Sequence, residues 1–202
     1  MQPFLTVGGK AAPLLAANVD TDVIMPKQFL KGIDRSGLDR GVFFALRFLE
    51  SGAPNPEFIL NRSPWQGAKF LVVGPNFGCG SSREHAVWGL KQLGIRALIG
   101  TSFAGIFHDN CQRNGVLTVR LEEDELRELG RLVGQPESNR ISVDLPAQQI
   151  HLQDGRTIGF RIDALRKEAL VQGLDAIGST LQRAEQIRAF ERRHLQENPW
   201  LA

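Results

Sequence analysis

The sequence predicts an α/β fold built on a parallel sheet, and two observations carry that prediction. Short apolar runs at residues 69–73 and 95–100 have the length and composition of buried strands. The segments between and after these runs have helical spacing, and each one ends at a glycine. Strands and helices that alternate at this spacing are typical of right-handed crossovers between parallel strands.

The parallel unit is preceded by a short helical region. Residues 38–50 are expected to form a helix, and the Gly- and Pro-rich stretch 51–58 is expected to form a loop. The strands and helices of the parallel unit should then alternate over residues 69–73, 82–93, 95–100, 102–115 and 116–121. The first of these helices has apolar residues at Ala86, Leu90 and Leu93, which lie on one face.

The second half of the chain has a different pattern. Residues 122–134 read as a surface helix, and the alternating segments after it, divided by turns, suit antiparallel strands. The expected strands are 141–145, 148–152 and 156–162, and the expected terminal helices are 163–173 and 181–195. We therefore expect one domain over residues 1–202, with a helical C-terminal extension from about residue 163.

Composition excludes several classes of protein. The 202 residues are 42% hydrophobic and 23% charged, with a net charge of +2, so no concentrated basic face for nucleic acid is expected. No apolar run reaches the roughly 18 residues of a membrane span, and the N-terminus lacks the pattern of a secretory signal. Two cysteines, Cys79 and Cys111, stand in unrelated contexts, which indicates no stabilising disulfide and a cytoplasmic location.

The stretch NFGCGSSREHA, from Asn76 to Ala86, concentrates glycines, hydroxyls, an arginine, an acid and a histidine after a predicted strand. It fits none of three common motifs. A Walker-type loop needs Gly-Lys before Ser or Thr, and this stretch has no lysine. A dinucleotide fingerprint needs a third glycine after Gly78 and Gly80, at the position that Arg83 occupies. A nucleophile elbow needs Gly-x-Ser-x-Gly, which neither serine satisfies.

Two interpretations of residues 81–85 remain open at this point. Ser81 and Glu84 have the spacing of a capping box, which would satisfy two backbone N–H groups at a helix start. Arg83 is harder to explain in this way, because a cation in the first helical turn opposes the helix macrodipole. It becomes favourable if an anion is bound, since backbone N–H groups and the guanidinium then converge on one carboxylate. His85 is either a packed side chain or a hydrogen-bond partner that orients the site.

The motif GCGSSREHA resembles the signature of the 3-isopropylmalate dehydratase small-subunit family, which is the swivelling domain of the aconitase superfamily. Further motifs fall in that family's order and spacing and cover nearly the whole chain. They are NVDTDVIMPKQFLK from Asn18, PNPEFILN from Pro54, SFAGIF from Ser102 with NCQRNG from Asn110, and GLDAIGSTL from Gly173. Five motifs in register make the resemblance specific, whereas Ser-Ser-Arg-Glu alone would be weak.

The resemblance implies a swivelling β/β/α fold and a hydro-lyase of leucine biosynthesis. Such an enzyme interconverts 2-isopropylmalate and 3-isopropylmalate through isopropylmaleate. In this family a separate large subunit carries the [4Fe-4S] cluster. Two cysteines agree with that, because a cluster takes roughly three or four thiolates. We therefore expect one half of a heterodimer that binds a hydroxy-diacid and holds no metal or cofactor itself, with Cys79 as a bystander.

The same match implies roles for three residues of the motif. Ser81 would be the base, acting as an alkoxide that donors at a helix N-terminus stabilise. Ser82 would hydrogen-bond the substrate, and Arg83 would hold a carboxylate in a bidentate fork. The partner's iron would act as the Lewis acid on the leaving hydroxyl.

A second segment is expected to support this site. Asp20, Thr21 and Asp22 are turn formers, and on their own they read as a turn or a helix cap. With the resemblance, Thr21 and Asp22 become supporting residues, together with His85. Lys27 and Lys31 are either anion contacts or ordinary surface charge.

Three places depart from the family pattern. Gly100-Thr101 and Gly105 replace an Ala-Pro pair and an aspartate, Val87 replaces a proline, and residues 44–46 replace a more polar sequence. The last departure lies in the stretch 28–61, which is expected to shape the pocket for the substrate side chain. The alternative reading is a related hydro-lyase acting on methylmalate/citraconate or homoaconitate. An alternative of a different class is a stand-alone anion-binding module.

Overall fold

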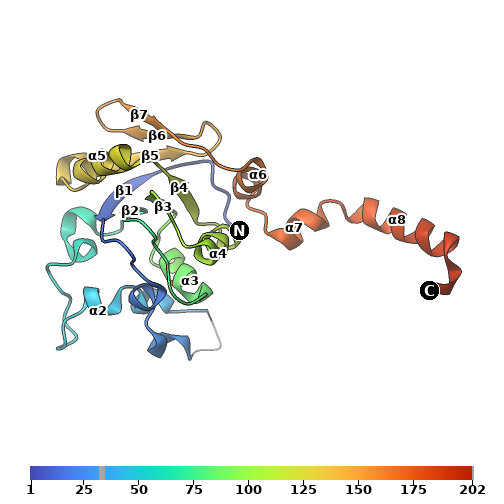
Figure 1. Cartoon of the computed structure of the whole chain (residues 1–202), viewed down its shortest axis with the longest axis horizontal. Helices are drawn as coiled ribbons and strands as arrows, with labels where there is room; N and C mark the ends of the chain where they lie inside the picture. Colours follow the sequence, from blue (N-terminus) through green and yellow to red (C-terminus); the bar gives the residue numbers. More distant parts are fainter. Residues whose placement is uncertain (32–34, 202) are drawn as a thin grey trace.

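A curled sheet of seven strands runs through the residues described by the computed structural model, which are 1–31 and 35–201 (Figure 1). The strand order is β4-β3-β2-β1-β5-β6-β7. The strands are β1 Thr6–Leu14, β2 Phe70–Val73, β3 Ala97–Gly100, β4 Leu117–Arg120, β5 Arg140–Asp144, β6 Gln149–Leu152 and β7 Thr157–Gly159. Strands β1 to β4 pair in parallel, and β1, β5, β6 and β7 pair antiparallel. The predicted α/β class and both types of pairing are confirmed.

The helices occupy both faces of the sheet and the C-terminal end of the chain. The α-helices are α1 Thr21–Ile24, α2 Phe44–Arg47, α3 Glu84–Gln92, α4 Gly105–Asn114, α5 Glu123–Val133, α6 Ala164–Gln172, α7 Ala176–Leu181 and α8 Ala184–Glu197. The short 3-10 helices are η1 Lys27–Leu30, η2 Leu38–Gly41, η3 Ile59–Asn61, η4 Ser63–Trp65, η5 Pro136–Ser138 and η6 Pro199–Leu201.

Two hydrophobic cores lie on opposite faces of the sheet, because successive residues of a strand point to opposite sides. In β2, Phe70 and Val72 join the core that contains α5, whereas Leu71 and Val73 join the core that contains α3 and α4. All four of these side chains are fully buried. Burial on both faces explains why the parallel strands read as continuous apolar runs rather than alternating ones.

Strand β1 is the strand that sequence reasoning missed, and it joins the two halves of the sheet. It pairs in parallel with β2 on one side and antiparallel with β5 on the other. Its sequence TVGGKAAPL hides it, because Gly8, Gly9 and Pro13 are unfavourable in strands. Glycine avoids crowding at position 9, since a Cβ atom there would lie 2.8 Å from Cδ of Lys69.

The helix expected over residues 38–50 is wrong. The chain forms η2 and then α2, interrupted at Phe43, which has a left-handed backbone with φ of 52°. The backbone N–H of Phe43 donates to the carbonyl of Ile24 at 2.9 Å instead of to a preceding helical turn. The fully buried Phe43 ring compensates for the unfavourable conformation, so tertiary packing overrides local helical spacing here.

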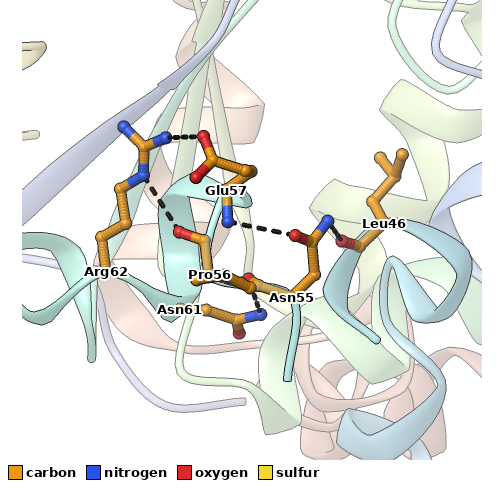
Figure 2. Close-up of polar contacts among 6 residues, drawn as sticks. All are labelled: Leu46, Asn55, Pro56, Glu57, Asn61 and Arg62. Atoms are coloured by element: carbon orange, nitrogen blue, oxygen red, sulfur yellow. Dashed lines mark hydrogen bonds and ion pairs between the residues drawn. The ribbon is translucent and has the colours of Figure 1, made fainter. Parts of the chain in front are cut away.

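The expected loop over residues 51–58 is confirmed, and side-chain amides hold it in shape (Figure 2). Asn55 donates to the carbonyl of Leu46 at 2.9 Å and accepts from the N–H of Glu57 at 3.0 Å. Asn61 donates to the carbonyl of Asn55 at 2.8 Å, and Arg62 pairs with Glu57. The stretch 28–61 also includes residues 32–34, which lie outside the described residues.

The C-terminal helices differ in how they contact the rest of the chain. Leu170 of α6 is buried in the core beside α5, whereas α7 and α8 have no buried residue and project away from the sheet (Figure 1). The extension was expected to run to residue 202, which is not among the described residues. None of the helices in the described ranges combines the length and the apolar character that crossing a membrane requires.

Gly78 gives the first testable prediction, because it packs directly against α4. Its φ is 78°, and a Cβ atom there would lie 2.2 Å from Cγ of Phe107. Gly78→Ala should therefore lower the free energy of unfolding by about 2–4 kcal/mol, from backbone strain and overpacking together. Urea unfolding measures this loss. Gly105→Ala is the control, because no atom lies within 4 Å of its Cβ position; equal losses in both variants would refute the account.

Candidate functional site

The candidate site lies where the segments that follow β1, β2 and β3 meet. Because these strands are parallel, their carboxyl ends share one edge of the sheet, which is where α/β proteins bind ligands. Isolated β-bridges join Asp20 to Cys79 and Phe77 to Phe103. The N–H of Asn76 also donates to Oγ of Ser102 at 2.8 Å. Backbone bridges and a hydrogen bond therefore connect the three segments.

Thr21 forms a buried link between the first segment and the serine motif. Its side chain is 1% exposed, and its Oγ1 donates to the carbonyl oxygen of Ser81 at 2.9 Å. Its backbone N–H donates to the carbonyl of Cys79, also at 2.9 Å. Gly80 lies between these two contacts with φ of 86°, a conformation that favours glycine. Thr21 therefore fixes the backbone that presents Ser81.

Asp20 and Asp22 have separate roles at the start of α1. The carboxylate of Asp20 accepts from the N–H of Val23 at 2.7 Å, so Asp20 is the N-cap, as the turn-or-cap interpretation expected. Asp22 lies in the first helical turn and forms an ion pair with Arg83. The Arg83 side chain is 22% exposed and that of Asp22 is 53% exposed, so the pair lies at the surface.

The capping box expected at the start of α3 is wrong. The helix begins at Glu84 rather than at the expected Ser82, its N-cap is Arg83, and no side chain caps it. Oε1 of Glu84 accepts from Nδ2 of Asn114 at 2.6 Å and so ties α3 to α4. Arg83 precedes the first helical turn instead of lying within it, and Asp22 is the anion beside it.

The two serine hydroxyls face solvent. Ser81 and Ser82 are both exposed, and neither Oγ hydrogen-bonds to any residue in the described ranges. The carbonyl of Ser81 accepts twice, from Thr21 and from the N–H of Arg83 at 2.8 Å. The backbone at Ser81 is thus held while its hydroxyl is open to a ligand, an arrangement suited to binding or proton transfer.

His85 and the two lysines have simpler environments. The His85 ring packs against Trp88 with centroids 4.6 Å apart, which agrees with the packed interpretation. Trp88 in turn carries the Arg35 guanidinium 4.0 Å above its ring. Lys27 and Lys31 are exposed, and neither forms an ion pair or side-chain hydrogen bond with a described residue. The structure brings Ser81, Ser82, Arg83, Thr21 and Asp22 together, and His85 lies in the first turn of α3.

The two thiols are separate and unpaired. Cys111 is fully buried in α4, and this burial raises the pKa of its thiol well above the usual value. Cys79 is half-buried in the motif loop. Within the described ranges, no group of three or more His, Cys, Asp or Glu side chains is arranged to hold a metal ion.

Sequence reasoning missed an asparagine pair at this edge of the sheet. Nδ2 of Asn76 donates to Oδ1 of Asn18 at 2.8 Å, and the N–H of Asn18 donates to the carbonyl of Pro75 at 2.9 Å. Both asparagines have φ of 56°. Asparagine tolerates this left-handed region better than most residues, so an asparagine in each of the turns that follow β1 and β2 was the available signal.

Comparisons with known proteins agree along the whole chain. Family models match residues 1–124 (Aconitase C-terminal domain), 128–164 (LeuD_N) and 177–202 (the C-terminal domain of the 3-isopropylmalate dehydratase small subunit). The 3-isopropylmalate dehydratase small subunit 1 of Mannheimia succiniciproducens is 63% identical over 100% of this chain and 99% of that protein. Small subunit 2 of Salmonella typhimurium is 58% identical over 100% of this chain and 96% of that protein.

A solved structure gives the same result for the fold. The crystal structure of 3-isopropylmalate dehydratase (leuD) from Methanocaldococcus jannaschii matches with a TM-score of 0.67 and 27% sequence identity. The match covers 93% of this chain and 99% of that chain. The swivelling aconitase-type fold expected from the sequence is therefore confirmed.

Thr21 gives the second testable prediction. Thr21→Val keeps the shape of the side chain but leaves the Ser81 carbonyl without its buried donor. The free energy of unfolding should fall by about 1–2 kcal/mol. Thr157→Val, at an exposed strand position, is the control and should change it by less than about 0.5 kcal/mol. Urea unfolding of both variants measures these changes. If the Thr21 variant is as stable as its control, the hydrogen bond from Thr21 to the Ser81 carbonyl does not stabilise the serine loop.

Proposed function

This chain belongs to the 3-isopropylmalate dehydratase small-subunit family, and from that premise we propose that Ser81, Ser82 and Arg83 form its half of the active site. The chain is the smaller of the two parts of a hydro-lyase of leucine biosynthesis. The observation that carries the residue assignment is the combination of an exposed Ser81 hydroxyl, a fixed Ser81 backbone and an adjacent guanidinium.

The reaction needs a base, an anchor for the carboxylates and a means to release hydroxide. In our proposal, Ser81 removes the carbon-bound proton next to the carbon that carries the hydroxyl, and hydroxide leaves to give isopropylmaleate. Water then adds with the opposite placement, and Ser81 returns the proton. In the described part of the chain, the N–H groups of Glu84 and His85 at the start of α3 have no other partner, so they can stabilise negative charge beside Ser81.

Arg83 and Ser82 bind the substrate in this proposal. A guanidinium matches a carboxylate with two parallel hydrogen bonds, which fixes the orientation of the diacid as well as its position. Asp22 holds Arg83 at the motif before substrate arrives. Because both members of this pair are partly exposed, their interaction is worth only about 0–1 kcal/mol, so a substrate carboxylate can replace or share Asp22 at little cost.

The partner in this proposal is a large subunit that carries a [4Fe-4S] cluster, whose iron would supply the Lewis acid for the leaving hydroxyl. This chain's own residues suit that division of labour. Cys111 is buried in α4, and Cys79 lies in the loop with no second thiolate beside it. A cavity of about 580 Å³ lies between the loops that follow the parallel strands and α5, and its lining includes Leu15, Gly74, Thr101 and Leu126, while Ser81 and Ser82 lie outside it on open surface. The partner would close this surface.

Two free thiols suit a reducing, cytoplasmic location.

Reconstitution tests the base assignment. The purified chain alone should be inactive, and addition of the cluster-bearing large subunit should restore isomerisation of isopropylmalate. Ser81→Ala should lower kcat by about 10²–10⁴-fold without loss of assembly, because the base is removed. Ser82→Ala should instead act mainly on KM.

Steady-state kinetics and size-exclusion chromatography give these quantities. Ser63→Ala, an exposed serine outside the motif, is the control and should behave as the unmodified chain. A Ser81 variant with a near-normal kcat would show that another group is the base. Assay of the same reconstituted pair against methylmalate and homoaconitate shows which of the related substrates the enzyme prefers.

Arg83 gives a prediction about binding. Arg83→Lys should raise KM by about 10–100-fold, because an ammonium cannot make the two-pronged contact and charged hydrogen bonds are worth about 1.5–3 kcal/mol. Asp22→Asn should change KM by less than about fivefold, as expected for an exposed pair. Arg62→Lys, whose ion pair with Glu57 lies outside the site, is the matched control. Equal KM values for the Arg83 and Arg62 variants would contradict the proposed carboxylate contact.

A further inference from the structure

The C-terminal arm, which we define as residues 176–201, exposes most of its large apolar side chains. These side chains are between 46% and 76% exposed, and they are Ile177, Leu181, Ile187, Phe190, Trp200 and Leu201. Neither α7 nor α8 has a buried residue. In Figure 1 the arm runs away from the sheet and its helices without folding back on them. Large apolar side chains exposed in this number on one short segment are typical of an interaction site.

The apolar side chains are arranged on helix faces. Ile177 and Leu181 are four residues apart in α7, and Ile187 and Phe190 are three apart in α8. Such spacing places each pair on one side of its helix. One turn further, the His194 ring stacks on Phe190 with centroids 5.4 Å apart and extends the same face. This is the pattern of an amphipathic helix that binds in an apolar groove.

The base of the arm is fixed to the rest of the chain. The N–H of Phe4 donates to the carbonyl of Leu170 at 2.9 Å, and both residues are buried. Gly173 ends α6 in a left-handed conformation with φ of 70°, where a Cβ would lie 2.7 Å from the backbone of Met1. Asp175 then caps α7 through the N–H of Gly178 at 2.7 Å. The arm therefore leaves the body from a defined point.

A groove of about 580 Å³ lies at this point, between α6, α7 and the start of α8. Polar side chains of these segments line it together with four apolar residues, Leu165, Ala169, Leu174 and Ile187. Leu165 is 77% exposed. The groove connects the body to the arm, so a partner seated on the arm would also contact α6.

The family matches indicate what covers this surface. Residues 1–124 match a domain named for the C-terminal part of aconitase, whereas residues 177–202 match a separate domain named for the dehydratase small subunit. The arm is thus associated with proteins in which this domain is a separate chain. A separate chain loses translational and rotational freedom on association, and added contact area can offset that loss.

We propose that the arm docks into an apolar groove on the large subunit and holds the two chains together, a role that rests on the proposed function. If each exposed apolar side chain offers on the order of 100 Å², the arm offers on the order of 600 Å², against roughly 800 Å² per partner in a standard interface. The arm therefore supplies much of a stable interface, while the serine motif approaches the substrate.

The double variant Ile187→Ser/Phe190→Ser of the full-length chain tests this proposal. Its Kd for the cluster-bearing large subunit should rise by about 100-fold or more, because buried interface anchors carry most of the binding energy. The kcat at saturating small subunit should be unchanged, since the arm does not touch the serine motif. Fluorescence titration measures the Kd, and reconstituted turnover measures the kcat.

The matched control is Arg192→Ser/Gln196→Ser, which places the same two serines on the opposite face of α8 and lowers helix propensity at least as much. It should retain the Kd of the unmodified chain, and unchanged urea unfolding shows that the body is intact. An unchanged Kd in the Ile187/Phe190 variant, or a change only in self-association, would overturn the docking proposal while activity stands. A pair that assembles through the arm but never isomerises isopropylmalate would instead refute the proposed function.

Discussion

The structure depends on the parallel pairing of β1 with β2, because this pairing brings two chain segments remote in sequence to one edge of the sheet. The segment after β1 carries Thr21 and Asp22, and the segment after β2 carries Ser81 and Arg83. A buried hydroxyl then joins them, since Thr21 donates to the Ser81 carbonyl at 2.9 Å. The loop that presents Ser81 is held through its backbone carbonyls. The Ser81 side chain is therefore not used to hold the loop and is available to a ligand.

The charge at the site follows from the same arrangement. Arg83 lies beside a helix N-terminus, where a cation is unfavourable, and Asp22 from the neighbouring segment offsets this. An exposed ion pair is worth about 0–1 kcal/mol. It therefore orients the guanidinium, but a ligand can displace Asp22 from it at little cost in free energy. A carboxylate ligand that a partner chain shields from water would interact more strongly, because screening falls as the site closes. A surface ion pair is in this way compatible with a binding function.

The sequence predicts the parallel unit well, because buried strands and glycine-ended helices have strong local signals. Prediction from the sequence fails where contacts between remote residues determine the local structure. Strand β1 carries two glycines and a proline, and its place in the sheet depends on pairing with β2 and β5. The expected helix at residues 38–50 is interrupted because Phe43 is buried in a left-handed conformation. The capping box fails because Glu84 binds Asn114 of α4, a residue 30 positions away. The Arg83–Asp22 pair could likewise not be read from local spacing.

The most direct test is a structure of the assembled large and small subunits with a diacid inhibitor bound. The account predicts that the Arg83 guanidinium makes two hydrogen bonds to an inhibitor carboxylate, with Oγ of Ser81 facing the carbon that loses its proton. A structure in which the inhibitor is bound while Arg83 contacts only Asp22 or solvent would contradict it.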